Sequence, residues 1–85
     1  MSQIEKAIQR IKSNPKDYTY DEAKSLLEHF GFIEDNKGKT SGSRVKYQRK
    51  TDKKLIMLHK PHPGSIMKSY NVKELKSFLE SLELI

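Results

Sequence analysis

Two histidines, His59 and His62, lie three residues apart in the segment HKPHPG, residues 59–64. An imidazole gives and takes protons near neutral pH because its unperturbed pKa is about 6.5. A paired acid and base can cleave RNA through the 2′-hydroxyl of the RNA itself, without a metal. Both residues could instead be purely structural: His59 could end a strand, and His62 could lie in a turn. The pattern alone leaves both readings open.

The chemistry of this segment does not extend to metal binding. The chain contains no Cys, and two histidines without an obvious converging carboxylate fall short of the three or four ligands of a zinc site. We therefore predict no metal and no cofactor. The absence of Cys also excludes disulfides and fits a reducing cytoplasm. No apolar run approaches the roughly 18 residues of a membrane span, so a soluble cytoplasmic protein is expected.

Positive charge is concentrated beside the histidines. The chain of 85 residues has 17 Lys and Arg against 11 Asp and Glu, a net charge of +6. Residues 1–36 are net acidic and residues 61–85 are neutral, so the excess lies in residues 37–60. An acidic partner, above all a nucleic acid, is the first expectation. The basic residues of this segment, opposed only by Asp52, are Lys37, Lys39, Arg44, Lys46, Arg49, Lys50, Lys53, Lys54 and Lys60.

The segment KTSGSRVKY, residues 39–47, places hydroxyls and cations where a loop enters a strand. Backbone N–H groups and the side chains of Ser43 and Arg44 could meet a phosphate there. The spacing of a nucleotide-binding P-loop is absent, so nucleotide hydrolysis is not supported. A solvated polar hairpin loop is the competing interpretation. The candidate RNA-binding residues are Lys37, Lys39, Ser43, Arg44, Lys46, Lys50 and Lys60.

Helices are expected before and after these segments. Apolar residues recur at helical spacing over Gln3–Lys12, behind a possible capping residue at Ser2. Thr19 and Glu22 have the spacing of a capping box for a second helix, which Gly31 should end. Asn71 is predicted to cap a final helix over residues 72–82, whose apolar stripe is Val72, Leu75, Phe78, Leu79 and Leu82.

Three strands are expected between the second and third helices. The first covers Phe32–Asp35, and the second alternates Arg44, Lys46, Gln48 and Lys50 with Val45 and Tyr47, which gives one polar, mostly cationic row. Residues 55–58 are apolar without a break, which predicts a third strand covered on both faces and hides its register. The order is therefore α-α-β-β-β-α. We predict an α+β fold in which helices cover one side of a three-stranded antiparallel sheet.

The run GFIEDNKGKTSGSRVKY, followed by LHKPHPGSIMKSYNVKELKSFLESL, resembles the HicA family of small toxins from toxin–antitoxin pairs. The resemblance covers residues 23–84. It implies a double-stranded-RNA-binding-domain-like fold, cleavage of mRNA, and neutralisation by a HicB-like antitoxin. The preceding helix resembles that of longer-headed members. We thus expect one HicA-like domain over residues 1–85, with an extra helix and connection at 1–18 and a core at 19–85.

The resemblance also bears on the site. The family generally carries Gly-Ser-His at the start of the second strand, and that histidine is catalytic, whereas Gly42 and Ser43 are followed here by Arg44. Arg44 could hold the scissile phosphate, but a guanidinium cannot act as a general base at pH 7. The catalytic candidates are therefore His62, His59 and Arg44, with the acid–base role assigned to a histidine.

A non-catalytic binding function is a second hypothesis that the sequence leaves open. The arginine at the family's histidine position would also suit a non-catalytic module that binds RNA or an antitoxin. A sequence-specific DNA binder is less favoured, because no helix has an exposed face dense in Arg, Asn and Gln.

Overall fold

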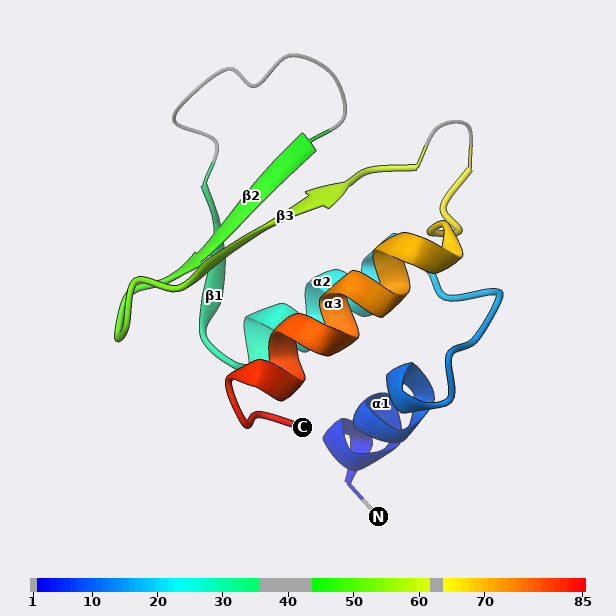
Figure 1. Cartoon of the computed structure of the whole chain (residues 1–85), viewed down its shortest axis with the longest axis horizontal. Helices are drawn as coiled ribbons and strands as arrows, with labels where there is room; N and C mark the ends of the chain where they lie inside the picture. The colour runs from blue at the N-terminus through cyan, green and yellow to red at the C-terminus, as the bar shows by residue number, and fades with distance from the viewer. Residues whose placement is uncertain (1, 36–43, 62–63) are drawn as a thin grey trace.

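The computed structural model describes residues 2–35, 44–61 and 64–85 of the chain. Its element order, α-α-β-β-β-α, confirms the predicted α+β class (Figure 1). No helix within those ranges is long and apolar enough to cross a membrane. The elements are α1 (Gln3–Lys12), α2 (Tyr20–His29), β1 (Phe32–Asp35), β2 (Arg44–Arg49), β3 (Leu55–His59) and α3 (Ser69–Ser81).

The first two helices begin as their sequences predict. The Ser2 hydroxyl accepts a hydrogen bond from the Glu5 backbone N–H, with an N–O distance of 3.3 Å. At the start of α2, the Thr19 hydroxyl accepts from the Glu22 N–H and the Glu22 carboxylate accepts from the Thr19 N–H, both at 3.2 Å. The capping box is therefore confirmed. Past the end of α2, Gly31 has a φ of 90°, which glycine adopts without steric cost.

The start of α3 differs from the prediction. The helix begins at Ser69, and its N-cap is Lys68, so the assignment of Asn71 as the N-cap was wrong. The Lys68 carbonyl accepts hydrogen bonds from the N–H groups of Asn71 and Val72, at 3.0 and 3.1 Å. These bonds already close the first helical turn ahead of Asn71. Asn71 is consequently a buried residue within that turn.

The three strands form an antiparallel sheet in the order β1-β2-β3. Tyr47 lies opposite Glu34 on β1 and Ile56 on β3, which fixes the register of both pairs. Since side chains alternate between faces, one face carries the buried residues Phe32, Tyr47, Ile56 and Leu58. We call the other side the open face, and its residues are Ile33, Asp35, Arg44, Lys46, Gln48, Leu55, Met57 and His59.

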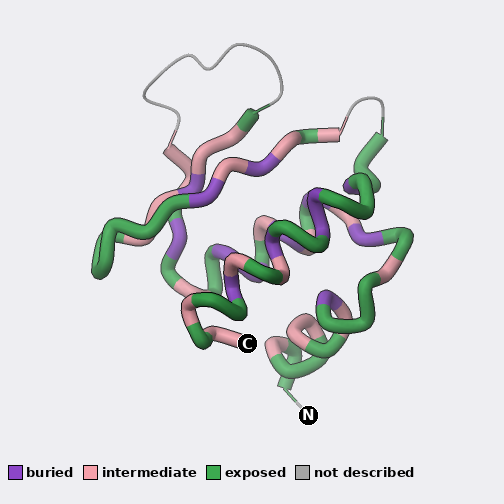
Figure 2. The backbone as a smooth tube through the Cα atoms, in the orientation of Figure 1, coloured by how far each residue is buried: buried purple, intermediate pink, exposed green. Residues whose placement is uncertain are grey.

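The expectation that the third strand is covered on both faces was wrong. Ile56 and Leu58 are buried, but Leu55 is 45 % exposed and Met57 is only half-buried. Figure 2 shows that buried and less buried stretches alternate along β3. Both α2 and α3 pack against the same side of the sheet, and α1 packs against those helices. No helix of the described chain therefore covers the open face.

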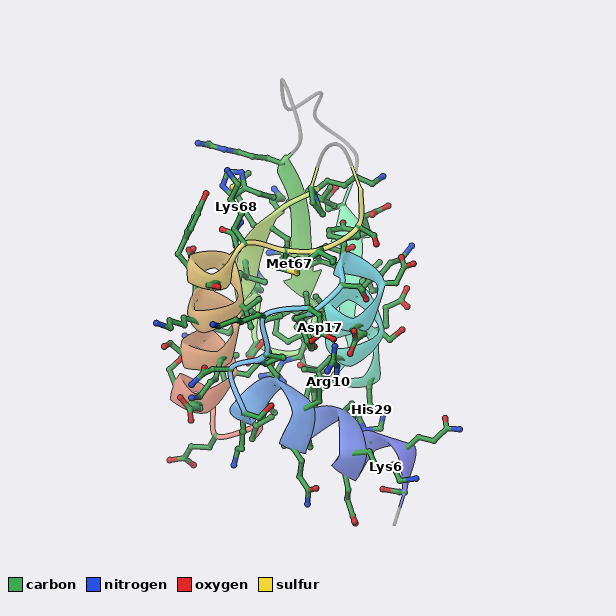
Figure 3. All side chains as sticks on the ribbon, turned by 90° about the vertical axis from the view of Figure 1, so that its right-hand side faces the viewer. Lys6, Arg10, Asp17, His29, Met67 and Lys68 are labelled. Carbon is green, nitrogen blue, oxygen red and sulfur yellow. The ribbon has the colours of Figure 1, made fainter. Side chains whose placement is uncertain are left out.

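Helix α1 forms a further layer behind α2 and α3. Ile11 is fully buried in the shared core. The Arg10 guanidinium donates hydrogen bonds to the Glu22 carboxylate of α2 and, at 3.1 Å, to the Asp17 carboxylate, and Figure 3 shows Arg10 and Asp17 close together. The N-terminal helix is thus joined to the fold by apolar burial and by an ion-pair network.

The connection between α1 and α2 also holds the segment that leads into α3. The Tyr20 N–H donates to the Ser65 carbonyl, and the Met67 N–H donates to the Tyr18 carbonyl, both at 2.8 Å. Thr19 and Ile66 form the isolated antiparallel bridge between these bonds. The segment that leads into α3 is therefore joined to the connection between α1 and α2.

The one-sided covering of the sheet can be tested with two leucines of β3. Leu58→Ala should lower the free energy of unfolding by about 2–5 kcal/mol, because it leaves a cavity in the core. Leu55→Ala on the open face should lower it by about 1 kcal/mol or less. Urea unfolding followed by circular dichroism measures both variants. Equal losses would show that both faces of β3 are covered.

Candidate functional site

Two of the three catalytic candidates lie side by side on the open face. Arg44 at the start of β2 is the direct cross-strand partner of His59 at the end of β3. Directly opposed side chains in an antiparallel pair have Cβ atoms about 4.5–5.5 Å apart and point to the same side. Arg44 is exposed and His59 is half-buried, so a solvent-borne substrate can reach both. The third candidate, His62, lies outside the described residues.

Lys46, the next cation on the open face after Arg44, lies beside an acidic residue. Lys46 lies opposite Asp35 of β1 and Met57 of β3. Its Nζ is 3.7 Å from the Asp35 Oδ2, so part of its charge is offset. The pairing of Asp35 with Lys46 depends on the register between the first two strands, which the sequence does not reveal. An exposed pair of this kind contributes about 1 kcal/mol or less to stability.

The other predicted RNA-binding residues do not gather at this point. Lys50 follows β2 at the opposite end from Arg44, roughly 20 Å away at the usual rise of a strand. Lys60 has the opposite parity to His59, and its Nζ lies 5.9 Å from the centre of the Tyr20 ring on the helical side of the sheet. The remaining candidates, Lys37, Lys39 and Ser43, lie outside the described residues.

Arg49, a cation of the basic segment, forms an ion pair with an acidic side chain. Arg49 donates hydrogen bonds to the Asp52 carboxylate, one of them 3.0 Å long, and its guanidinium lies 5.2 Å from the centre of the Phe32 ring. The bond from Arg49 lowers the pKa of Asp52 to about 2, and an N–H donated by Lys54 acts in the same direction. Arg49 therefore stabilises the β2–β3 turn and is not part of the open face.

Apolar side chains share the open face with the cations. Ile33 is 53 % exposed and lies across β2 from Leu55, with Gln48 between them. The face thus has an arginine and an imidazole at one end and an apolar row at the other. Sequence reasoning missed this row because the parity of the third strand could not be assigned.

Tyr47 is the aromatic residue that the alternation placed in the core, and the structure confirms that it is fully buried. Its hydroxyl lies 2.8 Å from the Tyr20 hydroxyl and donates to a Glu34 carboxylate oxygen at 3.4 Å. Burial raises the pKa of Tyr47, and its bond with Tyr20 raises it further. The residue is therefore a neutral anchor between α2 and the sheet, and bases cannot stack on it.

Within residues 2–35, 44–61 and 64–85, no group of three His, Asp or Glu side chains converges in a way that could hold an ion. The open face instead offers hydrogen-bond donors, one imidazole and apolar surface.

These features define a small α+β protein whose antiparallel sheet is covered by helices on one face and presents a cationic corner on the other. Residues 20–84 match the family described as HicA toxin of bacterial toxin–antitoxin, and the chain belongs to this family. Membership implies an antitoxin partner. The architecture is compatible with the expected double-stranded-RNA-binding-domain-like fold. Searches of curated proteins and of solved structures gave no significant match.

The β2–β3 turn, at the end of the two strands opposite Arg44 and His59, gives a pH test. Because the folded pKa of Asp52 is lowered to about 2, its contribution to stability is full above its unfolded pKa of about 3.9. That contribution is lost as the pH falls toward 2. The urea midpoint of Asp52→Asn should therefore lie below that of the wild type at pH 6, and the difference should shrink between about pH 4 and 2.

A double-mutant cycle provides the control. In an Arg49→Gln background, Asp52→Asn should change the midpoint much less, because the partner has already been removed. An undiminished effect in that background would contradict the assigned ion pair.

Proposed function

We propose that this HicA family member is a cytoplasmic toxin that binds mRNA on the open face of its sheet and cleaves it as a metal-independent endoribonuclease. The observation that carries the proposal is the cross-strand pair of Arg44 and His59. It supports a site in which a phosphate-binding guanidinium and a proton-transferring imidazole reach the same nucleotide. We treat residues 19–85 as the HicA-like core and residues 1–18 as an extra helix and connection of one domain.

The chemistry needs no cofactor. A histidine, His59 or the candidate His62, removes the proton from the RNA 2′-hydroxyl, and that oxygen attacks the adjacent phosphorus. The bond from phosphorus to the 5′-oxygen breaks as the new bond to the 2′-oxygen forms, and the 5′-oxygen takes up a proton from the other histidine or from water. The products are a 2′,3′-cyclic phosphate and a 5′-hydroxyl. Arg44 donates its planar set of N–H groups to the phosphate oxygens, where negative charge develops.

The proposed RNA path starts at Arg44 and passes Lys46. Lys50 at the far end and Lys60 beside Tyr20 can hold flanking phosphates, as can the candidates Lys37, Lys39 and Ser43. Such contacts position the backbone and carry no sequence information. Little sequence specificity is therefore expected.

A non-catalytic module that binds RNA or an antitoxin is the second candidate. The exposed apolar row of Ile33 and Leu55 favours it, because surface of this kind suits a protein partner. A HicB-like antitoxin that covers this row and the cationic corner would exclude RNA by competition. The two candidates therefore use the same surface, and only the first of them cuts RNA.

Cleavage is measured directly by incubating the purified protein with single-stranded RNA in the presence of EDTA. The wild type should release fragments that end in 2′,3′-cyclic phosphate. His59→Ala should slow cleavage by about 10²–10⁴-fold if this imidazole transfers the proton. His62→Ala is the matched variant that assigns the role to one histidine or the other.

Two outcomes would contradict the nuclease. Unchanged cleavage in both histidine variants would remove the histidine mechanism. Intact RNA with the wild type, together with cleavage by Arg44→His, would establish the non-catalytic module.

Binding is separable from cleavage when the RNA is fully 2′-O-methylated and lacks the attacking hydroxyl. Its affinity should fall with salt, with a slope of about −0.7 per phosphate contacted on a log–log plot. Arg44→Gln should reduce that slope by about 0.7 if Arg44 holds one phosphate. Lys6→Gln removes the same charge from the exposed side of α1 (Figure 3) and should leave the slope unchanged. Equal effects of the two variants would place the RNA elsewhere.

A further inference from the structure

A hollow of about 310 Å³ lies on the open face, toward the end that is remote from Arg44. Its lining includes the open-face residues Ile33, Asp35 and Gln48, and also Lys50, which follows β2. Gln48 is four residues along β2 from Arg44, roughly 13 Å away at the usual rise of a strand. An RNA cleaved beside Arg44 therefore has a flanking nucleotide within reach of the hollow.

The hollow has the size and the floor of a site for one flat ring system. Its volume is at the small end of the range of about 300–1,000 Å³ that is typical of ligand pockets. Ile33 is 53 % exposed and lies directly opposite Gln48 on the neighbouring strand. The flat face of a nucleobase gains from burial against an apolar side chain of this kind. The floor thus fits a base that has left the RNA stack.

Two of the polar groups at the hollow accept hydrogen bonds. The Gln48 Nε2 donates to the Lys53 carbonyl at 3.5 Å, which leaves the Gln48 Oε1 as an acceptor. Asp35 is the diagonal neighbour of Gln48 across the β1–β2 pair, so the two side chains start within about 7–8 Å of each other. The Asp35 carboxylate contacts Lys46 through Oδ2, but a carboxylate accepts several bonds and takes a further donor beside that lysine.

The third polar group is a donor. Lys50 has the same strand parity as Gln48, is exposed, and forms no ion pair within the described residues. Asp35 lies one row before Gln48 in the sheet, and Lys50 lies one row after it. This order offers a ligand an acceptor, a second acceptor and then a donor.

Among the four RNA bases, only guanine presents the matching edge. The Watson–Crick edge of guanine carries two adjacent donors, the 2-amino group and N1–H, followed by the acceptor O6. Adenine, cytosine and uracil each place at least one acceptor where guanine has a donor. Proteins read single-stranded RNA bases through hydrogen bonds to this edge.

We propose that this hollow holds a guanine base of the bound RNA and gives the protein a preference for guanine at one flanking position. The 2-amino group donates to the Asp35 carboxylate, N1–H donates to the Gln48 Oε1, and the Lys50 ammonium donates to O6. The base packs on Ile33. This inference rests on the proposed binding of RNA to the open face. Phosphate contacts carry no sequence information, so the preference comes from these side chains alone.

The affinities of a matched set of RNAs test the preference. Each RNA is a short, fully 2′-O-methylated oligouridine, either unchanged or with guanosine, adenosine or inosine at its central position. Binding to the full chain is followed by fluorescence anisotropy. The guanosine strand should bind about 5–10-fold more tightly than the all-uridine strand, which the adenosine strand should match. Inosine lacks only the 2-amino group, so its strand should fall between them.

Variants assign the contacts through ratios of affinity, which a general change in RNA binding does not alter. Gln48→Leu removes the acceptor but keeps a side chain of similar size, and it should lower the guanosine-to-uridine ratio about 2–5-fold. Asp35→Ala should abolish the difference between guanosine and inosine, although it releases Lys46 and strengthens the binding of every strand. Gln9→Leu makes the matched change at an exposed residue of α1 and should leave both ratios unchanged.

Two outcomes would overturn this inference while leaving RNA binding in place. One is equal affinity of the wild type for all four strands, and the other is a guanosine preference that is unchanged in both Gln48→Leu and Asp35→Ala. If no strand binds, the all-uridine strand included, the proposed function itself fails and this inference fails with it.

Discussion

The burial of Tyr47 determines which side chains of β2 lie on the open face of the sheet. This side chain is fully buried, and its hydroxyl is held by Tyr20 of α2 and Glu34 of β1. Because side chains alternate along a strand, a buried Tyr47 forces Arg44, Lys46 and Gln48 to the opposite face. A shift of one residue in β2 would bury these polar groups and expose the tyrosine. The orientation of the cationic row is therefore a consequence of core packing.

The same constraint explains the mixed character of the open face. Once β2 is fixed, antiparallel pairing places His59 beside Arg44, and it places Leu55 on the face where α2 and α3 are absent. Arg44 and His59 thus lie at one end of this face, and the exposed Ile33 and Leu55 lie toward the other. If the proposed function is correct, RNA binds at the cationic end, and an antitoxin that covers the apolar end and reaches the cationic corner excludes it.

The local signals in the sequence predicted the fold well, because they depend on neighbouring residues. The capping box of Thr19 and Glu22 and the alternation around Tyr47 are examples. The start of α3 was placed at Asn71 because its side chain is a good cap, whereas the Lys68 carbonyl closes the first turn earlier. The exposure of Leu55 and the pairings of Arg44 with His59 and Lys46 with Asp35 depend on register between strands, which an unbroken apolar run does not encode.

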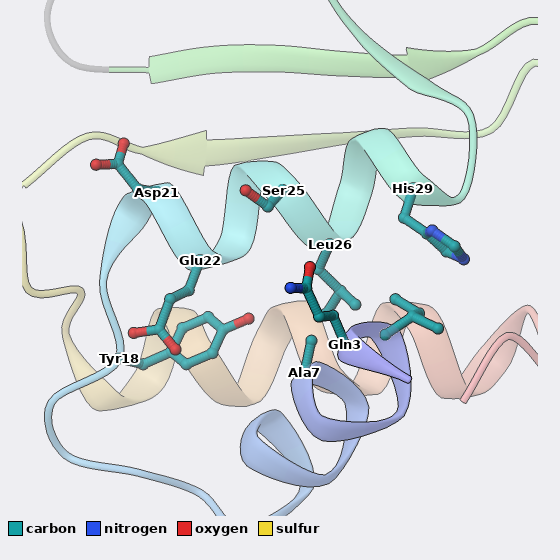
Figure 4. A pocket seen from close by; sticks show the side chains of 9 residues that line it. Gln3, Ala7, Tyr18, Asp21, Glu22, Ser25, Leu26 and His29 are labelled. Atoms are coloured by element: carbon teal, nitrogen blue, oxygen red, sulfur yellow. The ribbon is translucent and has the colours of Figure 1, made fainter. Parts of the chain in front are cut away.

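The place of the Tyr18 side chain, directed toward the space between α1 and α2 (Figure 4), likewise depends on how the two helices pack, and no motif in the sequence marks it. The central claim, however, concerns the open face. Its most direct test is NMR mapping of a 2′-O-methylated single-stranded RNA on the ¹⁵N-labelled protein. Shifts concentrated at Arg44, Lys46 and His59 are predicted, whereas shifts concentrated on α1 and α2 would contradict the account.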